Sequence, residues 1–258
     1  MLQNLSKPAI IAHRGASAYA PENTLSAFDL ALRQGADAIE LDAKLTADGH
    51  VVVIHDQTVD RTTPASGKVR DINLTEIRKL DAGSHFDIAF RGEKIPTLEE
   101  VLHSFGQLIY INIELTNYSS LSDDLPEKVA SLVKQNKLTR RVFFSSFNFV
   151  NLLRIRRLVP EAPIGLLAHP GWKGFLIRSR LSQKINFQSL HIHAHDSTPQ
   201  LIEKIHRKNR KIFVYTVNGE NEMRTFFHLG VDGIFTDDPP LAQRTIKNIK
   251  LLQSDRNP

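Results

Sequence analysis

Side chains that can bind metal ions or transfer protons stand where apolar runs of the sequence give way to turn residues. His13 and Arg14 end the run from Ala9 to Ala12, and Gly15 lets the backbone turn sharply after them. Later runs end in the same way, at Glu40 and Asp42, at His55 and Asp56, and at Glu114. We therefore expect these residues to form one site, although they lie far apart in the sequence.

The three carboxylates indicate a site for a hard cation. Glu40 and Asp42 alternate along a predicted strand, so their side chains point to the same side of it. If Glu114 joins them, three negative charges would repel one another unless a proton or a cation intervenes. Oxygen ligands of this kind suit one divalent ion, Ca²⁺ or Mg²⁺. The alternative is that each carboxylate pairs with a nearby cation such as Lys44 or Arg14.

The two histidines and the arginine complete a set suited to cleaving a phosphate ester. A histidine alone at a strand end is usually a packing residue, but His13 and His55 each stand beside a charged neighbour. One imidazole can accept a proton while the other donates one, because histidine titrates near neutrality. The planar guanidinium of Arg14 matches the geometry of phosphate oxygens. The pattern leaves open which histidine acts as the base.

Alternating strands and helices are predicted to position these residues. The expected strands cover residues 9–13, 37–45, 109–115, 141–145, 163–168, 188–194, 211–217 and 232–236. The expected helices cover residues 24–34, 97–105, 125–136, 148–158, 173–183, 198–207, 220–228 and 240–250. Eight such units in 258 residues favour an α/β fold, a (β/α)₈ barrel that forms one catalytic domain over 1–258. In such barrels the site lies at the carboxyl ends of the strands.

Local signals refine the first part of the chain. Asn23 is a plausible N-cap for the first helix, and Thr97 opens a capping box with Glu100. Asp48-Gly49 predicts a hairpin to a returning strand over 51–55. If Thr46 pairs with Val51, His55 lies opposite Asp42. Residues 56–95 break the pattern and predict a small inserted subdomain, for which covering the site is one hypothesis.

Composition restricts the class of protein. There is no cysteine, which excludes disulfides and thiolate metal sites, and no apolar run approaches the roughly 18 residues of a membrane-spanning helix. With no leader-like segment at the amino terminus, we expect a cytoplasmic protein. The net charge of +5 comes from short basic clusters without interleaved aromatics, so we expect a solvated basic surface that attracts anionic substrates modestly, and no nucleic acid partner. Nothing in the sequence indicates the oligomeric state.

The motifs, taken in order, resemble the glycerophosphodiester phosphodiesterase family over nearly the whole chain. They are His13-Arg14-Gly15, Pro21-Glu22-Asn23-Thr24, Glu40-x-Asp42, His55-Asp56, Asp60-Arg61-Thr62-Thr63, Ile95-Pro96-Thr97-Leu98, Asn112-Ile113-Glu114, Val217-Asn218 and the run from Gly230 to Pro239. The resemblance implies a TIM barrel with a small insertion after the second strand. It also implies metal-dependent hydrolysis of glycerophosphodiesters to sn-glycerol 3-phosphate and an alcohol.

The same resemblance implies a role for each matched residue. Those matching His13 and His55 are the acid–base pair, and those matching Glu40, Asp42 and Glu114 hold the metal. Arg14 matches the phosphate contact, Glu22 matches a position in or beside the site, and Asn218 and Tyr215 are expected on the substrate side. Two positions depart from the family. Thr116 replaces a usual lysine, and Tyr215 replaces a frequent tryptophan, which affects substrate preference more than the type of reaction.

Two other functions remain consistent with the residues. His191, His193 and His195 alternate on one predicted strand, so a barrel hydrolase could bind zinc through His191, His193 and Asp237. Leu190, Ile192 and Ala194 occupy the opposite face, however, which also fits an ordinary barrel strand. The missing lysine at Thr116 makes a non-catalytic phosphoester-binding protein the second alternative.

Overall fold

A closed barrel of parallel strands forms the centre of the computed structural model, which describes residues 1–118, 120, 122–171 and 186–254. Within those residues the eight parallel strands are β1 (Ala9–Ala12), β2 (Ala38–Leu45), β4 (Tyr110–Leu115), β5 (Val142–Ser146), β6 (Ile164–Ala168), β7 (Ser189–His193), β8 (Lys211–Tyr215) and β9 (Gly233–Thr236). Strand β1 pairs with both β9 and β2, which closes the ring. The predicted TIM barrel is confirmed.

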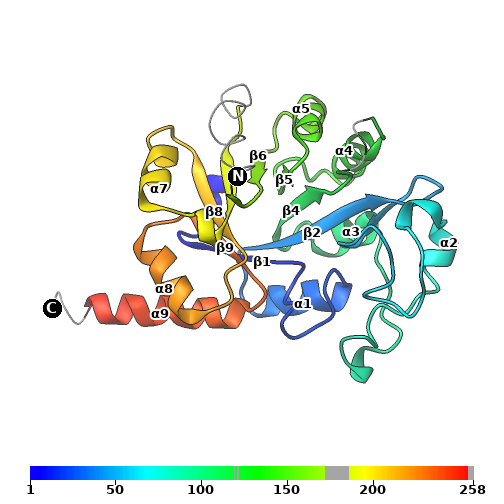
Figure 1. Ribbon diagram of the computed structural model, residues 1–258, viewed down its shortest axis with the longest axis horizontal. Helices are drawn as coiled ribbons and strands as arrows, with labels where there is room; N and C mark the ends of the chain where they lie inside the picture. Colours follow the sequence, from blue (N-terminus) through cyan, green and yellow to red (C-terminus); the bar gives the residue numbers. More distant parts are fainter. Residues whose placement is uncertain (119, 121, 172–185, 255–258) are drawn as a thin grey trace.

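Helices surround the barrel on its outer side (Figure 1). They are α1 (Leu25–Arg33), α3 (Leu98–Phe105), α4 (Leu125–Gln135), α5 (Phe149–Leu158), α7 (Pro199–His206), α8 (Glu220–His228) and α9 (Pro239–Ser254). Seven of the eight predicted barrel helices are therefore found among the described residues, and the predicted helix 173–183 lies outside them. None of the described helices is long and apolar enough to cross a membrane.

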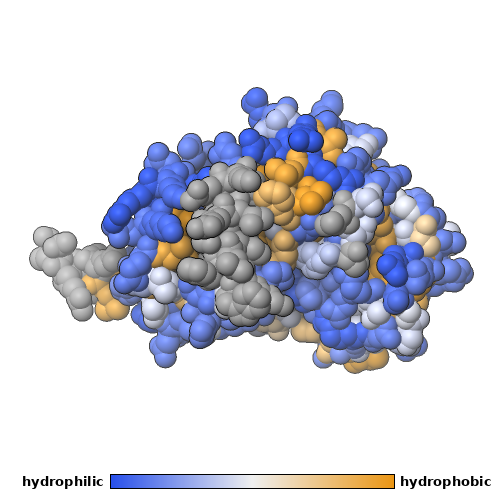
Figure 2. All heavy atoms as spheres, turned by 45° about the horizontal axis from the view of Figure 1, so that its top comes forward, coloured by the Kyte–Doolittle hydropathy of each residue, from blue (hydrophilic) through white to orange (hydrophobic). Residues whose placement is uncertain are grey.

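Apolar side chains fill both sides of the strands, because a parallel barrel buries its strands completely. One cluster packs between the strands and the helices, including Phe28 of α1 and Leu98 of α3. A second cluster lies on the other face of the strands and consists of Ala9, Ile11, Ala38, Phe143, Phe213 and Phe235 together with Leu2 and Leu5. On the face shown in Figure 2, hydrophilic residues cover most of the described surface, and hydrophobic residues form only small patches.

The first helix and the hairpin differ in detail from the sequence prediction. Thr24, not Asn23, caps α1, since its hydroxyl accepts from the Ala27 N–H at 3.2 Å, while Asn23 has a φ of 59°. The hairpin to β3 (Val51–Val53) is present, but Leu45 pairs with Val51. The expected register is therefore wrong by one residue, because the turn has three residues and not four. As a result Ile54, and not His55, lies opposite Asp42, and Ile54 donates its N–H to the Asp42 carbonyl.

The segment from residue 56 to residue 95 contains only short helical elements. They are η2 (Val69–Asp71), α2 (Leu74–Ile77) and η3 (Ile88–Phe90), and the segment lies beyond the end of β2 in Figure 1. Its apolar residues form one cluster with two residues of the hairpin, Val52 and Ile54; those from the segment are Val59, Val69, Ile77, Ala82 and Ile95. The predicted capping box of α3 follows it, with Thr97 and Glu100 each accepting from the other's backbone N–H. The segment is thus packed against the hairpin through this cluster, and the capped helix α3 follows it.

Candidate active site

The carboxyl ends of the strands open into a cavity of about 380 Å³. Its lining residues are His13, Arg14, Glu40, Asp42, His55, Asn112, Glu114, Tyr118, Ser145, Phe147, Leu167, His191, His193, Tyr215, Thr216 and Phe235. The strand register explains the meeting of distant residues, because Glu40 lies beside Asn112 and Asp42 beside Glu114. Seven of the nine predicted site residues line this cavity; Glu22 and Asn218 do not.

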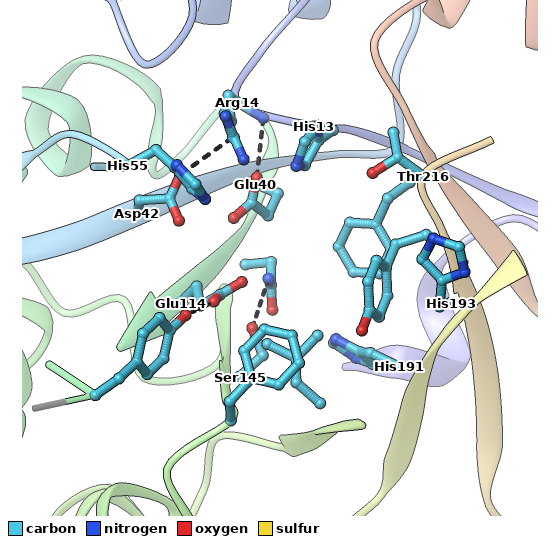
Figure 3. Close-up of a pocket in the computed structure, with 16 residues that line it drawn as sticks. His13, Arg14, Glu40, Asp42, His55, Glu114, Ser145, His191, His193 and Thr216 are labelled. Atoms are coloured by element: carbon cyan, nitrogen blue, oxygen red, sulfur yellow. Dashed lines mark hydrogen bonds and ion pairs between the residues drawn. The ribbon is translucent and has the colours of Figure 1, made fainter. Parts of the chain in front are cut away.

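The three predicted metal-ligating carboxylates form one cluster, in which Glu40 and Asp42 are buried and Glu114 is half-buried. Oxygen atoms of Glu40, Asp42 and Glu114 all lie within 4.8 Å of one another (Figure 3). Burial and the neighbouring charges of Asp42 and Glu114 raise the pKa of Glu40 well above its usual range. Burial, together with the charge of Asp42, raises the pKa of Glu114 to about 8. The cluster therefore favours an added positive charge, and its hard oxygen donors match Ca²⁺ or Mg²⁺.

Arg14 is held against this cluster by its backbone as well as its side chain. Its φ of 57° turns its N–H toward Glu40, which accepts it at 2.9 Å. The guanidinium donates to Glu22 at 3.0 Å and lies 3.4 Å from Asp42. The following residue must be glycine, because a Cβ on Gly15 would lie 2.7 Å from the Ala27 carbonyl carbon. Glu22 therefore orients Arg14 from outside the cavity.

His13 is paired with an aspartate from the other end of the chain. Its Nδ1 lies 2.7 Å from the Asp237 carboxylate, which follows β9. Asn218 and Ser17 also donate to this carboxylate, at 2.6 and 3.0 Å. Burial opposes ionisation of Asp237, but these hydrogen bonds outweigh it and lower its pKa. Asn218 thus lies behind His13 and uses its amide on Asp237.

His55 has an equivalent partner in its neighbour Asp56. The His55 Nδ1 lies 2.6 Å from the Asp56 carboxylate. Asp56 also accepts from Arg61, and this hydrogen bond, with a further contribution from His55, lowers the pKa of Asp56 to about 2. In both pairs the aspartate contacts Nδ1, which leaves Nε2 as the ring nitrogen that could transfer a proton.

A lysine from the adjacent strand lies at the position where Thr116 departs from the family pattern. Lys44 is 4 % exposed, and its ammonium donates to the Thr116 hydroxyl at 2.7 Å. Thr116 in turn donates to the Ala43 carbonyl at 2.8 Å. A buried positive charge therefore lies next to position 116, although Lys44 is not among the cavity-lining residues.

Aromatic side chains form part of the cavity lining. Phe147 packs edge-on against both Tyr118 and Tyr215, with ring centroids 5.7 and 6.2 Å apart. The Tyr215 hydroxyl donates to the Ala168 carbonyl at 2.7 Å, so the residue presents its ring to the cavity. The Tyr118 hydroxyl contacts Glu114. The extra hydroxyl of Tyr215, relative to a tryptophan, is thus engaged with the barrel backbone.

The histidine strand does not assemble a zinc site within the described residues. His191 is fully buried among Phe143, Phe213 and Phe235, and burial lowers its pKa to about 3. Its Nε2 lies 3.0 Å from the Ser189 hydroxyl. Among those residues, the acidic cluster is the one group of three or more side chains placed to share a metal ion. Asp237, the third ligand considered from sequence, contacts His13.

Several supporting contacts were not apparent from the sequence. Asp237 stands 224 residues from His13, and no local pattern links them. Asn23 donates to Asp42 at 2.9 Å and so supports the acidic cluster. Arg61 bridges Glu22 and Asp56. Asn23, Arg61 and Asp237 all belong to motifs matched by resemblance, which was the available signal.

Comparisons with known proteins agree with this geometry. Residues 13–241 match the Glycerophosphoryl diester phosphodiesterase family. A glycerophosphodiester phosphodiesterase from Caldanaerobacter subterraneus is 43% identical over 235 residues, covering 90% of this chain and 95% of that protein. A phosphodiesterase from Oleispira antarctica, solved in complex with the product sn-glycerol-3-phosphate, is 32% identical with a TM-score of 0.85, covering 93% of this chain and 97% of the other.

A crystal structure from Agrobacterium tumefaciens carries the same family name. This glycerophosphodiester phosphodiesterase is 34% identical to the present chain with a TM-score of 0.77, and the match covers 91% of this chain and 98% of the other. The agreement thus extends over nearly the full length of each relative. The chain belongs to the glycerophosphodiester phosphodiesterase family and is a phosphoric diester hydrolase.

Proposed function

We propose that the chain hydrolyses glycerophosphodiesters to sn-glycerol 3-phosphate and an alcohol, using His13 and His55 as an acid–base pair beside one divalent cation. The observation that carries this proposal is the pairing of each histidine Nδ1 with an aspartate, at 2.7 and 2.6 Å, on two sides of one acidic cluster. The product bound in the Oleispira antarctica relative supports the choice of substrate. Residues 1–258 would then act as one catalytic barrel.

The cation would be Ca²⁺ or Mg²⁺, held by Glu40, Asp42 and Glu114. Their oxygens lie within 4.8 Å of one another, and desolvation together with the negative charge of the neighbouring carboxylates raises the pKa values of Glu40 and Glu114. When bound, such an ion neutralises charge on the phosphate oxygens and polarises the phosphorus centre. The backbone N–H of Arg14 and the amide of Asn23 hold two of the three carboxylates in place.

The histidines would move the protons. One Nε2 accepts the proton of the oxygen that attacks phosphorus, and the other donates a proton to the alkoxide as its bond to phosphorus breaks. Asp237 and Asp56 would fix the orientation and the tautomer of the two rings. In Figure 3, His13 and His55 lie on either side of Arg14, above the carboxylates. A phosphate bound between the two rings would then have one proton-transferring group on each side.

The remaining predicted residues would bind the substrate or orient other residues of the site. Arg14 would contact the phosphate oxygens, and Glu22 would hold Arg14. Tyr215 would contact the organic part of the substrate through its ring, since its hydroxyl is bonded to Ala168. For Asn218 the contacts favour an indirect role, in which it orients His13 through Asp237.

A panel of glycerophosphodiesters tests the proposed function. With Ca²⁺ or Mg²⁺ restored after chelation, we expect release of sn-glycerol 3-phosphate, measured by a coupled dehydrogenase assay. Recovery of activity with zinc alone would instead favour the histidine-strand hydrolase. A phosphodiester that stays bound and intact in the presence of each metal would favour the phosphoester-binding protein.

Replacing Arg14 with alanine is expected to lower kcat/KM roughly a hundredfold, the scale of losing one preorganised donor to a charged transition state. Among the described residues that line the cavity, Arg14 is the only lysine or arginine. The matched control is Arg33→Ala, because Arg33 is 66% exposed and pairs with Asp29 on the surface of α1. Unchanged kcat/KM in Arg14→Ala would mean that other groups hold the phosphate.

A further inference from the structure

Arg61 is the one described residue in the 56–95 segment whose side chain contacts two carboxylates that each support a site residue. Its Nη1 and Nη2 donate to the two Glu22 oxygens, both at 2.7 Å. Its Nε and Nη2 donate to the two Asp56 oxygens at 2.7 and 3.2 Å. All three guanidinium nitrogens are therefore used, and both carboxylates are held by two hydrogen bonds.

Each of these carboxylates also contacts a residue that lines the cavity. The Glu22 oxygen that accepts from Arg61 Nη2 also accepts from Arg14, at 3.0 Å. The Asp56 oxygen that accepts from Arg61 Nη2 also contacts His55 Nδ1, at 2.6 Å. Arg61 is thus one side chain removed from the expected phosphate ligand and from one of the two expected proton-transferring groups.

Arg61 lies outside the described cavity. It is absent from the lining residues, and its side chain is 46% exposed. Its backbone is nevertheless well supported. Val59 donates its N–H to Gly67, the Thr63 hydroxyl donates to the Val59 carbonyl, and Val59 is fully buried in the apolar cluster of the segment.

We propose that Arg61 is a positioning residue that fixes Arg14 and His55 relative to each other, and that through it the 56–95 segment sets the geometry of the active site. The inference rests on the proposed function. A lysine could not take this place, because its single ammonium cannot form paired hydrogen bonds with two carboxylates at once. Small displacements of reacting groups are costly, so loss of these contacts is expected to reduce catalysis without removing any group that touches the substrate.

Single variants separate the effect of the Glu22 contact of Arg61 from the effect of its Asp56 contact. Glu22→Gln weakens the hold on Arg14 and is expected mainly to raise KM, whereas Asp56→Asn releases His55 and is expected mainly to lower kcat. Arg61→Gly is expected to do both, with kcat/KM reduced about 10- to 100-fold. If Arg61 acts through these two carboxylates, adding Arg61→Gly to the Glu22→Gln/Asp56→Asn double variant costs little more.

Chemical rescue distinguishes positioning from general stabilisation. Millimolar methylguanidinium is expected to restore a large part of the activity of Arg61→Gly, while methylammonium at the same concentration is not. Arg61→Lys is expected to stay close to Arg61→Gly in activity. Arg70→Gly is the matched control, since Arg70 lies in the same segment, is 66% exposed and pairs with the exposed Asp71. Assays run well below the Tm of each variant, so that all proteins compared are folded.

Three outcomes would overturn the inference. They are kcat and KM within twofold of wild type in Arg61→Gly, no response to methylguanidinium, or a further tenfold loss when Arg61→Gly joins the double variant. The wild-type enzyme is the reference for the proposed function. If it fails to release sn-glycerol 3-phosphate, the proposed function is wrong; if it succeeds and Arg61→Gly matches it, only the role of Arg61 is wrong.

Discussion

Replacing His13 or His55 with alanine is expected to lower kcat at least about a hundredfold, the usual scale of general acid–base catalysis. Each ring lines the cavity and is fixed by an aspartate at Nδ1, so each variant removes one proton-transferring atom and leaves the acidic cluster intact. Initial rates of sn-glycerol 3-phosphate release at saturating substrate measure the effect. KM is expected to change less, because Arg14 and the cation site remain.

Two further variants show whether the effect comes from proton transfer. His103→Ala removes an exposed histidine on α3, away from the cavity, and should leave kcat unchanged. Asp237→Asn keeps the ring of His13 but replaces the carboxylate that accepts from it, so kcat should fall while the fold is retained. Near wild-type turnover in either alanine variant, with contaminating enzyme excluded, would contradict the proposed mechanism.

Glu114→Gln is expected to abolish metal-dependent hydrolysis and at the same time to stabilise the metal-free protein at alkaline pH. The folded protein holds the pKa of Glu114 at about 8, whereas an unfolded glutamate titrates near 4.3. Between these pH values the folded state binds the additional proton. The free energy of unfolding contributed by Glu114 therefore decreases as the pH rises from about 5 to 8.

Thermal unfolding in chelator at pH 5.5 and pH 8.5 measures this difference. The wild-type Tm should fall between the two pH values more than the Tm of Glu114→Gln, and Ca²⁺ or Mg²⁺ should restore the wild type but not the variant. Glu99→Gln, at an exposed position on α3, is the control and should follow the wild type. Equal pH dependence in wild type and Glu114→Gln would show that Glu114 carries no charge in need of a cation.

Much of the barrel could be predicted because its signals are local. Apolar runs bounded by turn residues located the strands, and the carboxyl-end rule then grouped Glu40, Asp42 and Glu114 without any knowledge of the register. The hairpin shows the limit of this reasoning. Asp48-Gly49 identified the turn, but only the hydrogen bonds of Thr46 with His50 show that the turn has three residues.

The parts that escaped prediction depend on side chains that meet only after folding. A sequence pattern can place Asn218 near a strand end, yet the direction of its amide depends on Asp237 and Thr236. Lys44 lies on the predicted strand over 37–45, and the sequence indicated only that it could pair with the carboxylates. Its hydrogen bond to Thr116 depends on the lateral pairing of β2 with β4, for which no local spacing exists.

The closure of the barrel between β1 and β9 has a consequence for synthesis of the protein. During synthesis His13 leaves the ribosome 224 residues ahead of Asp237, which orients it. The pairing of Ala12 with Thr236 brings the two together. A nascent chain that has completed every other strand still lacks an oriented His13. We therefore expect catalytic competence to arise only after Asp237 has been synthesised and β9 has paired with β1, and chains that end before Asp237 to be inactive.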